Sequence, residues 1–132
     1  MLANKSRAEL FDQLPYPGAS PNAIYLYVKE DIFVTDFAND LPTQTAQQLW
    51  ASQQPASTAA LDTPSQAAAW KTIPSWYFIS TGDRVITPTA EREMAQRAHS
   101  TVTVFNGGSH LTLISHPDAV TAVIQTAINS IH

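Results

Sequence analysis

The sequence contains no cysteine, which excludes a disulfide framework, a thiolate nucleophile and a zinc–cysteine site. It also lacks any apolar run near the roughly 18 residues that a membrane-spanning helix requires. The opening residues, MLANKSRAELFDQ, include no apolar stretch of the signal-peptide type. We therefore expect a cytoplasmic protein with no membrane partner, in keeping with the absence of cysteine.

Positive charge is scarce as well. Seven Lys and Arg residues stand against eleven Asp and Glu residues, giving a formal net charge of −4. The basic residues are scattered and form no stripe, which argues against a nucleic-acid partner. The 132 residues, 44% hydrophobic and 14% charged, are typical of one globular domain with room for a core.

The second half of the chain has the clearest secondary-structure pattern. Aromatic and β-branched residues predict strands at 76–79 and 102–105, and a Thr-Pro start predicts a helix over about 88–99 between them. A second helix opens at Pro117 and carries one apolar stripe, made of Val120, Val123, Ile124, Ala127, Ile128 and Ile131. The order strand–helix–strand–helix predicts two neighbouring parallel strands with a right-handed crossover.

The first half has a weaker pattern. Residues 25–28 and 31–34 could form a small hairpin, and a helix is expected over 40–55. Residues 61–70 have room for one or two helical turns. This composition, rich in Ala, Gln, Ser, Thr and Pro, indicates a layer laid over another core.

One acidic and one basic candidate follow the two predicted strands. Asp83 comes after the first strand and His110 after the second, in the stretch FNGGSHL. Because neighbouring parallel strands end at the same sheet edge, we expect the two side chains to meet. The carboxylate would accept from one imidazole nitrogen and leave the other free to take a proton. Gly107 and Gly108 would let the backbone turn sharply before the histidine.

Residues 69–131 resemble the C-terminal portion of an α/β-hydrolase, and the motifs that carry the resemblance are IPSWYFISTGDRVITP, MAQRA, GGSH and SHPDAV. The similar group is that of small esterases such as plant methylesterases and hydroxynitrile lyases. Residues 22–69, with DFANDLP, resemble the cap that this group inserts before its last two strands. The resemblance implies a partial α/β-hydrolase fold. Residues 70–132 would supply the last two parallel strands with flanking helices, and residues 1–69 a mostly helical cap.

The resemblance also implies catalytic roles. Asp83 and His110 match the acid and the histidine of a Ser-Asp-His triad, in the family's order of acid before base. The family's nucleophile lies in G-x-S-x-G, but no two of the four glycines of this chain bracket a serine in that spacing. The chain would then be one portion of a carboxylic-ester hydrolase, incomplete by itself because the nucleophile and oxyanion hole are absent. Lyase chemistry on the same scaffold stays open.

Other polar and aromatic residues have simpler alternatives. Asp83 could be a turn carboxylate that accepts its own backbone amides or pairs with Arg84. His116 fits a helix start, and His110, His116 and Asp118 lack recognised metal-ligand spacing, so we expect no metal and no cofactor. An apolar substrate pocket could be lined by Trp50, Trp70, Tyr25, Tyr27 and Phe33.

Two functions follow from these observations. The first is a hydrolase portion that acts on a small-molecule ester once it is complemented. The alternative is a non-catalytic binding or interaction module derived from a hydrolase. A two-stranded sheet leaves apolar faces uncovered, so in both cases we expect a homo-oligomer or a complementary N-terminal half as partner.

Overall fold

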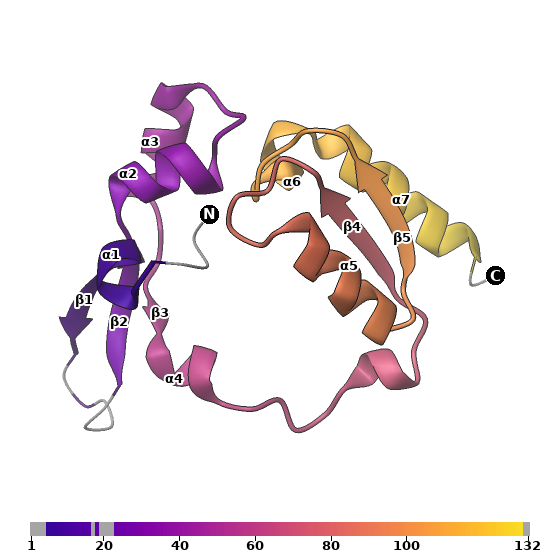
Figure 1. Ribbon diagram of the computed structural model, residues 1–132, viewed down its shortest axis with the longest axis horizontal. Helices are drawn as coiled ribbons and strands as arrows, with labels where there is room; N and C mark the ends of the chain where they lie inside the picture. Colours follow the sequence, from indigo (N-terminus) through magenta and orange to yellow (C-terminus); the bar gives the residue numbers. More distant parts are fainter. Residues whose placement is uncertain (1–4, 17, 19–22, 131–132) are drawn as a thin grey trace.

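The structure is a computed structural model that describes residues 5–16, 18 and 23–130 (Figure 1). Its C-terminal part forms the predicted strand–helix–strand–helix order, in which β4 and β5 pair in parallel from Trp76↔Thr101 to Ser80↔Phe105. The elements of this part are β4 (Trp76–Ser80), α5 (Pro88–Arg97), β5 (Thr101–Phe105), α6 (Thr112–Ser115) and α7 (Pro117–Ser130). Ile131, the last residue of the predicted apolar stripe, lies outside the described residues.

Local sequence explains the helix that joins the two parallel strands. The side chain of Thr87 accepts a hydrogen bond from the Ala90 N–H at 3.2 Å, and Pro88 occupies the first helical position. Trp76 and Phe78 point from β4 toward α7, with which they line a common groove. Since side chains alternate along a strand, Ile79 points to the opposite face, where it is fully buried.

The N-terminal part combines a small antiparallel sheet with short helices (Figure 1). The sheet has the order β1-β2-β3, and β2 pairs with β1 from Phe11↔Val28 to Pro15↔Ile24. In chain order the elements are α1 (Arg7–Leu10), β1 (Phe11–Pro15), β2 (Ile24–Val28), α2 (Glu30–Ile32), the π-helix η2 (Phe33–Phe37), α3 (Thr43–Ala51), β3 (Ala56–Ser57), α4 (Thr58–Asp62) and the 3₁₀-helix η3 (Ala69–Lys71).

The hairpin predicted from residues 25–28 and 31–34 is wrong in its second strand. The chain enters a helix directly after β2, where the Phe33 N–H donates to the Lys29 carbonyl at 2.8 Å. The DIFV segment therefore buries Ile32 and Phe33 from a helical backbone, and the strand that pairs with β2 is β1. The helix expected over 40–55 is shorter than predicted, because it begins at Thr43 after Pro42 and ends at Ala51.

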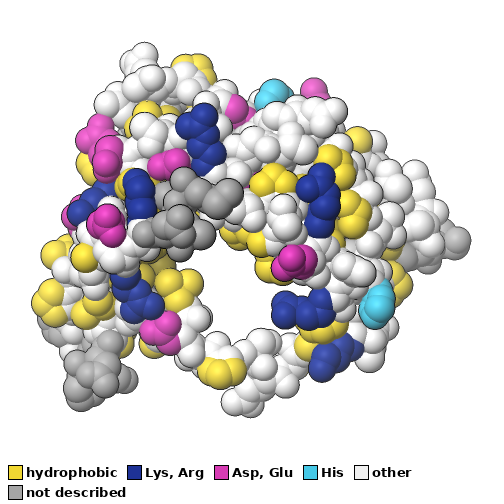
Figure 2. Space-filling view, in the orientation of Figure 1, with side chains coloured by type: hydrophobic (Ala, Val, Ile, Leu, Met, Phe, Trp, Pro, Cys, Tyr) yellow, Lys and Arg dark blue, Asp and Glu magenta, His cyan; other side chains and the backbone are white. Residues whose placement is uncertain are grey.

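The two parts of the chain meet where η2 and the turn after it reach the ends of β4 and β5. Phe33, Ala38 and Ala46 form a buried cluster, and Leu111 from the C-terminal part packs against it. The Arg84 guanidinium donates to the Thr35 carbonyl at 3.0 Å across the same junction. Elsewhere an opening separates the two parts (Figure 2). Within the described ranges, no helix has the length and apolar character needed to cross a membrane.

Candidate active site

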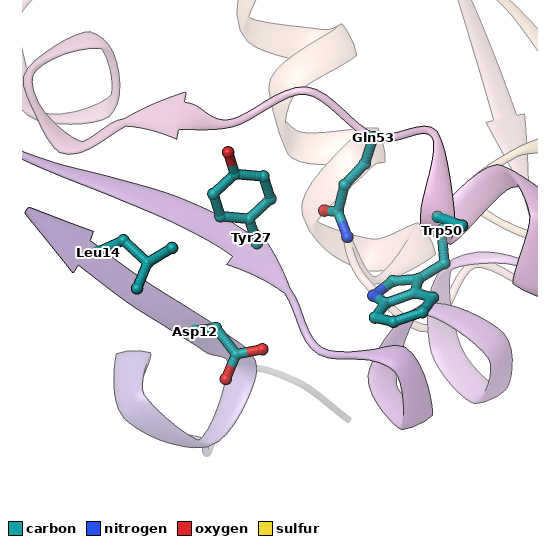
Figure 3. Close-up of a pocket in the computed structure, with 6 residues that line it drawn as sticks. Asp12, Leu14, Tyr27, Trp50 and Gln53 are labelled. Atoms are coloured by element: carbon teal, nitrogen blue, oxygen red, sulfur yellow. The ribbon is translucent and has the colours of Figure 1, made fainter. Parts of the chain in front are cut away.

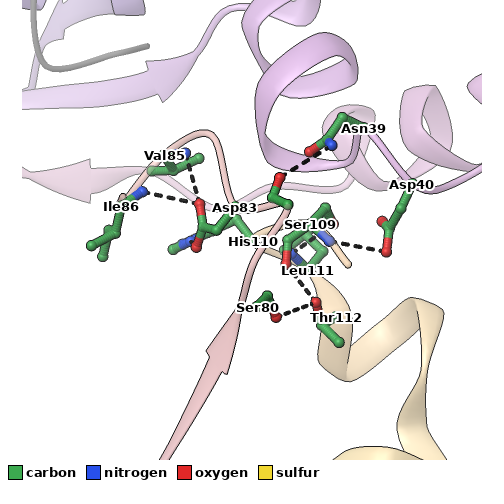
Figure 4. Close-up of polar contacts among 11 residues, drawn as sticks. Asn39, Asp40, Ser80, Asp83, Val85, Ile86, Ser109, His110, Leu111 and Thr112 are labelled. Carbon is green, nitrogen blue, oxygen red and sulfur yellow. Dashed lines mark hydrogen bonds and ion pairs between the residues drawn. The ribbon is translucent and has the colours of Figure 1, made fainter. Parts of the chain in front are cut away.

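Asp83 and His110 meet at the carboxyl edge of the parallel sheet (Figure 4). His110 Nδ1 lies 2.9 Å from Asp83 Oδ2. The two loops that carry these residues are joined by backbone hydrogen bonds, since the Gly82 N–H donates to the Gly107 carbonyl at 3.0 Å. The structure thus brings together the two residues that the sequence pattern placed after neighbouring strands.

Glycine allows the two loops to approach this closely. A Cβ on Gly82 would overlap the carbonyl oxygen of Gly108, so the loops touch backbone to backbone. Gly107 and Gly108 have φ angles of 86° and 70°, which lie in the left-handed region that favours glycine. These two residues turn the chain so that the histidine faces the end of β4.

Asp83 is buried, with its side chain only 4% exposed. Its Oδ1 accepts from the N–H groups of Val85 and Ile86 at 2.7 and 3.0 Å, and its Oδ2 faces His110. Burial acts to raise the pKa of Asp83, but the hydrogen bonds from His110 and the two amides outweigh it and hold the pKa below its usual value. The carboxylate therefore both accepts from the amides of its own turn and contacts the histidine. Arg84 does not pair with it, because its guanidinium donates to the Thr35 carbonyl.

The imidazole of His110 is held on one side only. Its ring packs edge-on against Phe37 with centroids 5.2 Å apart, and its side chain is 31% exposed. Nδ1 faces the carboxylate, and Nε2 makes no hydrogen bond to any residue that the structure describes. A neutral imidazole whose Nδ1 binds a carboxylate carries its one ring proton on Nδ1. Its Nε2 is then unprotonated and available as a general base.

No serine among the described residues hydrogen-bonds to His110. Ser109 is buried, and its hydroxyl accepts from the Leu111 N–H at 3.0 Å. The Ser80 hydroxyl lies 2.6 Å from the Thr112 hydroxyl, and the Ser115 hydroxyl donates to Asp40. The hydroxyls nearest the acid–base pair therefore have other partners.

A second carboxyl group lines the cavity that the pair borders. Glu91 on α5 is 7% exposed, and it shares a cavity of about 250 Å³ with the acid–base pair and with Ser80, Ser109 and Thr112. Its Oε2 is buried without a hydrogen-bond partner among the described residues. Burial, followed by the negative charge of Asp83, raises the pKa of Glu91 to about 7. Glu91 falls within the helix predicted over about 88–99, but nothing in the local sequence shows its proximity to Asp83.

Two further polar residues reach the site from the N-terminal part. Asn39 Nδ2 donates to the Gly82 carbonyl at 3.3 Å, and Asp40 Oδ2 accepts from the Ser109 N–H at 3.0 Å (Figure 4). His116 Nε2 lies 3.6 Å from the same Asp40 oxygen, just before α7 begins. Sequence reasoning missed these contacts, although the DFANDLP motif contains both residues.

The five aromatic residues expected to line one pocket are not gathered around it. Tyr27 and Trp50 border a cavity of about 290 Å³ with Asp12, Leu14 and Gln53, well within the N-terminal part (Figure 3). The other three lie in different environments: Phe33 is buried in the core, Tyr25 stacks on Tyr16, and Trp70 lies on the surface near Lys71 and Arg97. The expectation fails because β2 and the helices after it point these side chains in different directions.

Among the residues with described positions, no group of three or more His, Asp or Glu side chains is placed to hold a metal ion. His110 is engaged by Asp83, and His116 lies beside Asp40.

Comparisons with known proteins agree with this architecture. A family model described as the alpha/beta hydrolase family matches residues 3–123. The crystal structure of polyneuridine aldehyde esterase is similar with a TM-score of 0.72 and 10% sequence identity, and the match covers 89% of this chain and 48% of that one. A histidine-to-alanine mutant of that esterase matches with a TM-score of 0.71 and 9% identity, covering 88% and 47%.

These likenesses concern the fold. No curated protein matches the chain. The chain spans about half the length of the solved structures named above. The predicted fold class is confirmed, with two parallel strands and flanking helices that correspond to part of a larger α/β architecture.

Proposed function

The chain belongs to the α/β-hydrolase family, and from that premise we propose that it provides the acid and the base of a Ser-Asp-His triad in a carboxylic-ester hydrolase. The observation that carries the proposal is the 2.9 Å contact between His110 Nδ1 and Asp83 Oδ2. The two esterase structures of the same fold support the choice of an ester as substrate.

The chemistry follows from the two sides of the imidazole. A serine hydroxyl would attack the ester carbonyl while His110 Nε2 takes the serine proton, and His110 would then return that proton to the departing alcohol. A water molecule, deprotonated by the same nitrogen, would release the acid and restore the serine. Asp83 would hold the Nδ1–H tautomer and stabilise the imidazolium. Its lowered pKa keeps it ionised at neutral pH for this role.

The serine and the oxyanion-hole donors would come from a segment outside these 132 residues, either of a longer chain or of a second chain. No G-x-S-x-G occurs in the sequence, and Nε2 makes no hydrogen bond to a described hydroxyl. In this arrangement residues 1–69 would act as the cap over residues 70–132.

Exposed apolar surface supports the need for a partner. Ile124 and Ile128 on α7 are 55% and 49% exposed along the groove that α7 forms with β4. On the opposite face of the sheet, Val102 and Val104 of β5 are also exposed. Such surface on both sides of a two-stranded sheet is typical of an interface. A second copy of this chain or a complementary N-terminal half would cover it.

A non-catalytic binding module is the second candidate. The observation that favours it is the absence of a described hydroxyl at Nε2, since a histidine without a nucleophile performs no acyl transfer. In that case the exposed groove between β4 and α7 would be the working surface.

Ester hydrolysis tests both candidates. The purified chain is assayed with a small activated ester, alone and together with the segment encoded immediately upstream. We expect no activity from the chain alone. If the upstream segment contains G-x-S-x-G, we expect activity that His110→Ala lowers on the order of 10²–10⁴-fold. The matched control is His99→Asn, an exposed histidine whose φ of 52° asparagine tolerates.

Each outcome bears on one claim. His110-dependent hydrolysis by the chain alone would show that it contains its own nucleophile. Activity of the combined protein that survives His110→Ala would show that His110 is not the general base. An upstream region without G-x-S-x-G would favour the binding module.

A further inference from the structure

Adjacent residues of one turn in the N-terminal part contact both loops of the acid–base pair. Asn39 Nδ2 donates to the carbonyl of Gly82, the residue before Asp83, at 3.3 Å. Asp40 Oδ2 accepts from the N–H of Ser109, the residue before His110, at 3.0 Å. Figure 4 shows the two side chains reaching toward the two loops from the same side.

Asp40 is the stronger of the two attachments. Besides the Ser109 N–H, its Oδ2 accepts from the Ser115 hydroxyl at 2.5 Å, at the end of α6. Burial acts to raise the pKa of Asp40, but the hydrogen bonds from Ser109 and Ser115 outweigh it and hold the pKa below its usual value. The carboxylate is thus ionised at neutral pH, and hydrogen bonds to a charged acceptor are stronger than those to a neutral one.

The end of η2, directly before this turn, also holds the chain just after His110. The Leu111 N–H donates to the Phe37 carbonyl at 3.2 Å, and the Phe37 ring lies edge-on to the imidazole. The residues before and after His110 are therefore both attached to residues 37–40. Among the described residues of the C-terminal part, by contrast, the backbone–backbone hydrogen bonds that join the two loops end at Gly107, and only side-chain contacts join them beyond it.

Two buried polar atoms of this turn lack hydrogen-bond partners among the described residues, which lowers the stability of the fold. Oδ1 of Asn39 and Oδ1 of Asp40 are buried without a hydrogen-bond partner among the described residues. A buried polar atom that lacks a partner destabilises the folded state, and such atoms are often found where the group serves another purpose. Here both side chains use their remaining atoms to bind the two loops of the site.

We propose that Asn39 and Asp40 are positioning residues, which hold the Asp83 and His110 loops at the separation that gives the Nδ1–Oδ2 contact. Their importance for ester hydrolysis rests on the proposed function, but the positioning itself concerns only groups described in this chain. The N-terminal part would then contribute to the alignment of the base as well as to any covering of a substrate.

The test measures the Nδ1 proton of His110 by ¹H–¹⁵N NMR on the full chain, without substrate. When Asp83 holds the imidazole, this proton exchanges slowly with water. Asp40→Ala removes the acceptor of Ser109, and we expect exchange to become faster by about tenfold, the factor that one hydrogen bond to a charged group contributes. Asp40→Asn keeps an oxygen acceptor without the charge, so it should restore part of the protection.

The matched control is Asp36→Ala. Asp36 lies on η2 of the same part, and among the described residues its carboxylate bonds only to the neighbouring Thr35 hydroxyl at 3.1 Å, so exchange should stay at the wild-type rate. A folded Asp40→Ala chain with wild-type exchange would overturn the proposal. If Asp40→Ala does not fold, Asn39→Ala decides: faster exchange supports the proposal and a wild-type rate overturns it. Because no ester is used, this result is independent of whether the protein hydrolyses esters.

Discussion

Gly82 lies directly against Gly108, and this contact sets the distance between the acid loop and the base loop. A methyl group on Gly82 would overlap the Gly108 carbonyl oxygen, which belongs to backbone and cannot rotate away. Gly82→Ala should therefore push the loops apart, break the Nδ1–Oδ2 contact and lower stability. The His110 Nδ1 proton signal and the urea midpoint measure both effects.

Gly107→Ala is the comparison for that change. Unlike Gly82, Gly107 has a positive φ, but open space surrounds the position of its missing Cβ. Alanine there should cost about 1–2 kcal/mol of backbone strain and leave the His110–Asp83 contact intact. Equal loss of the Nδ1 signal in both variants would contradict the close-contact account.

Glu91→Gln should stabilise the chain in a pH-dependent way. The folded-state pKa of Glu91 is raised from 4.5 to about 7. Below pH 4.5 the side chain is protonated in both the folded and the unfolded state, so its ionisation does not change the free energy of unfolding. As pH rises from 4.5 to about 7, the unfolded state ionises before the folded state does, and stability falls. Glutamine cannot ionise, so the variant should be more stable than the wild type at pH 8 and no more stable at pH 4.

Urea unfolding at the two pH values measures this difference. Glu93→Gln is the control, because Glu93 lies on the same helix and is exposed. A Glu91→Gln advantage that is the same at both pH values would show that ionisation is not its cause.

Asp83→Asn tests the opposite sign of linkage. The folded-state pKa of Asp83 is lowered, so its carboxylate contributes stability above its ordinary value of 3.8 and loses that contribution as pH falls through the folded-state value. The variant should be less stable than the wild type at pH 7, and the gap should narrow toward pH 3.

Asp83→Ala should be worse than Asp83→Asn at pH 7. It leaves the amides of Val85 and Ile86 without an acceptor, at a cost of about 1–3 kcal/mol. Thermal unfolding at pH 7 compares the two variants. Equal stability of Asp83→Ala and Asp83→Asn would mean that the turn does not depend on this acceptor.

The double change Ile124→Lys and Ile128→Lys should reduce self-association. Both side chains are exposed on the apolar stripe of α7, and charges there would oppose burial against a second copy. Sedimentation velocity measures the shift from oligomer to monomer. Gln125→Lys adds a charge to the same helix at an exposed polar position and should leave the oligomer intact. A wild-type chain that is monomeric at high concentration would contradict the prediction.

Local signals predicted the C-terminal part well. The Thr87-Pro88 start and the β-branched run before Phe105 act over a few residues, and the parallel order of the strands follows from the helix between them. The same pattern predicted that Asp83 and His110 would lie close together. β1 was missed because most of its side chains are exposed and it ends in Pro15, so its sequence shows no apolar alternation.

The contacts of Asn39 and Asp40 could not be predicted in this way. They join residues 43 and 69 positions apart and depend on how the N-terminal part docks, which no local pattern encodes. The aromatic pocket failed for the same reason, since pocket lining is a property of tertiary arrangement. Glu91 could not be singled out either. It occupies an ordinary helix position in the sequence, and its pKa is raised only because the folded chain buries it near Asp83.

Asp83 and His110 lie at the two ends of a single crossover, 27 residues apart in the chain. Bringing them together requires closing only one short loop, whose entropic cost is small and whose folding is fast. The pair can therefore assemble early, before distant segments find their places. Two residues of the proposed triad are therefore encoded in one contiguous stretch, which could be inherited, duplicated or exchanged as a piece.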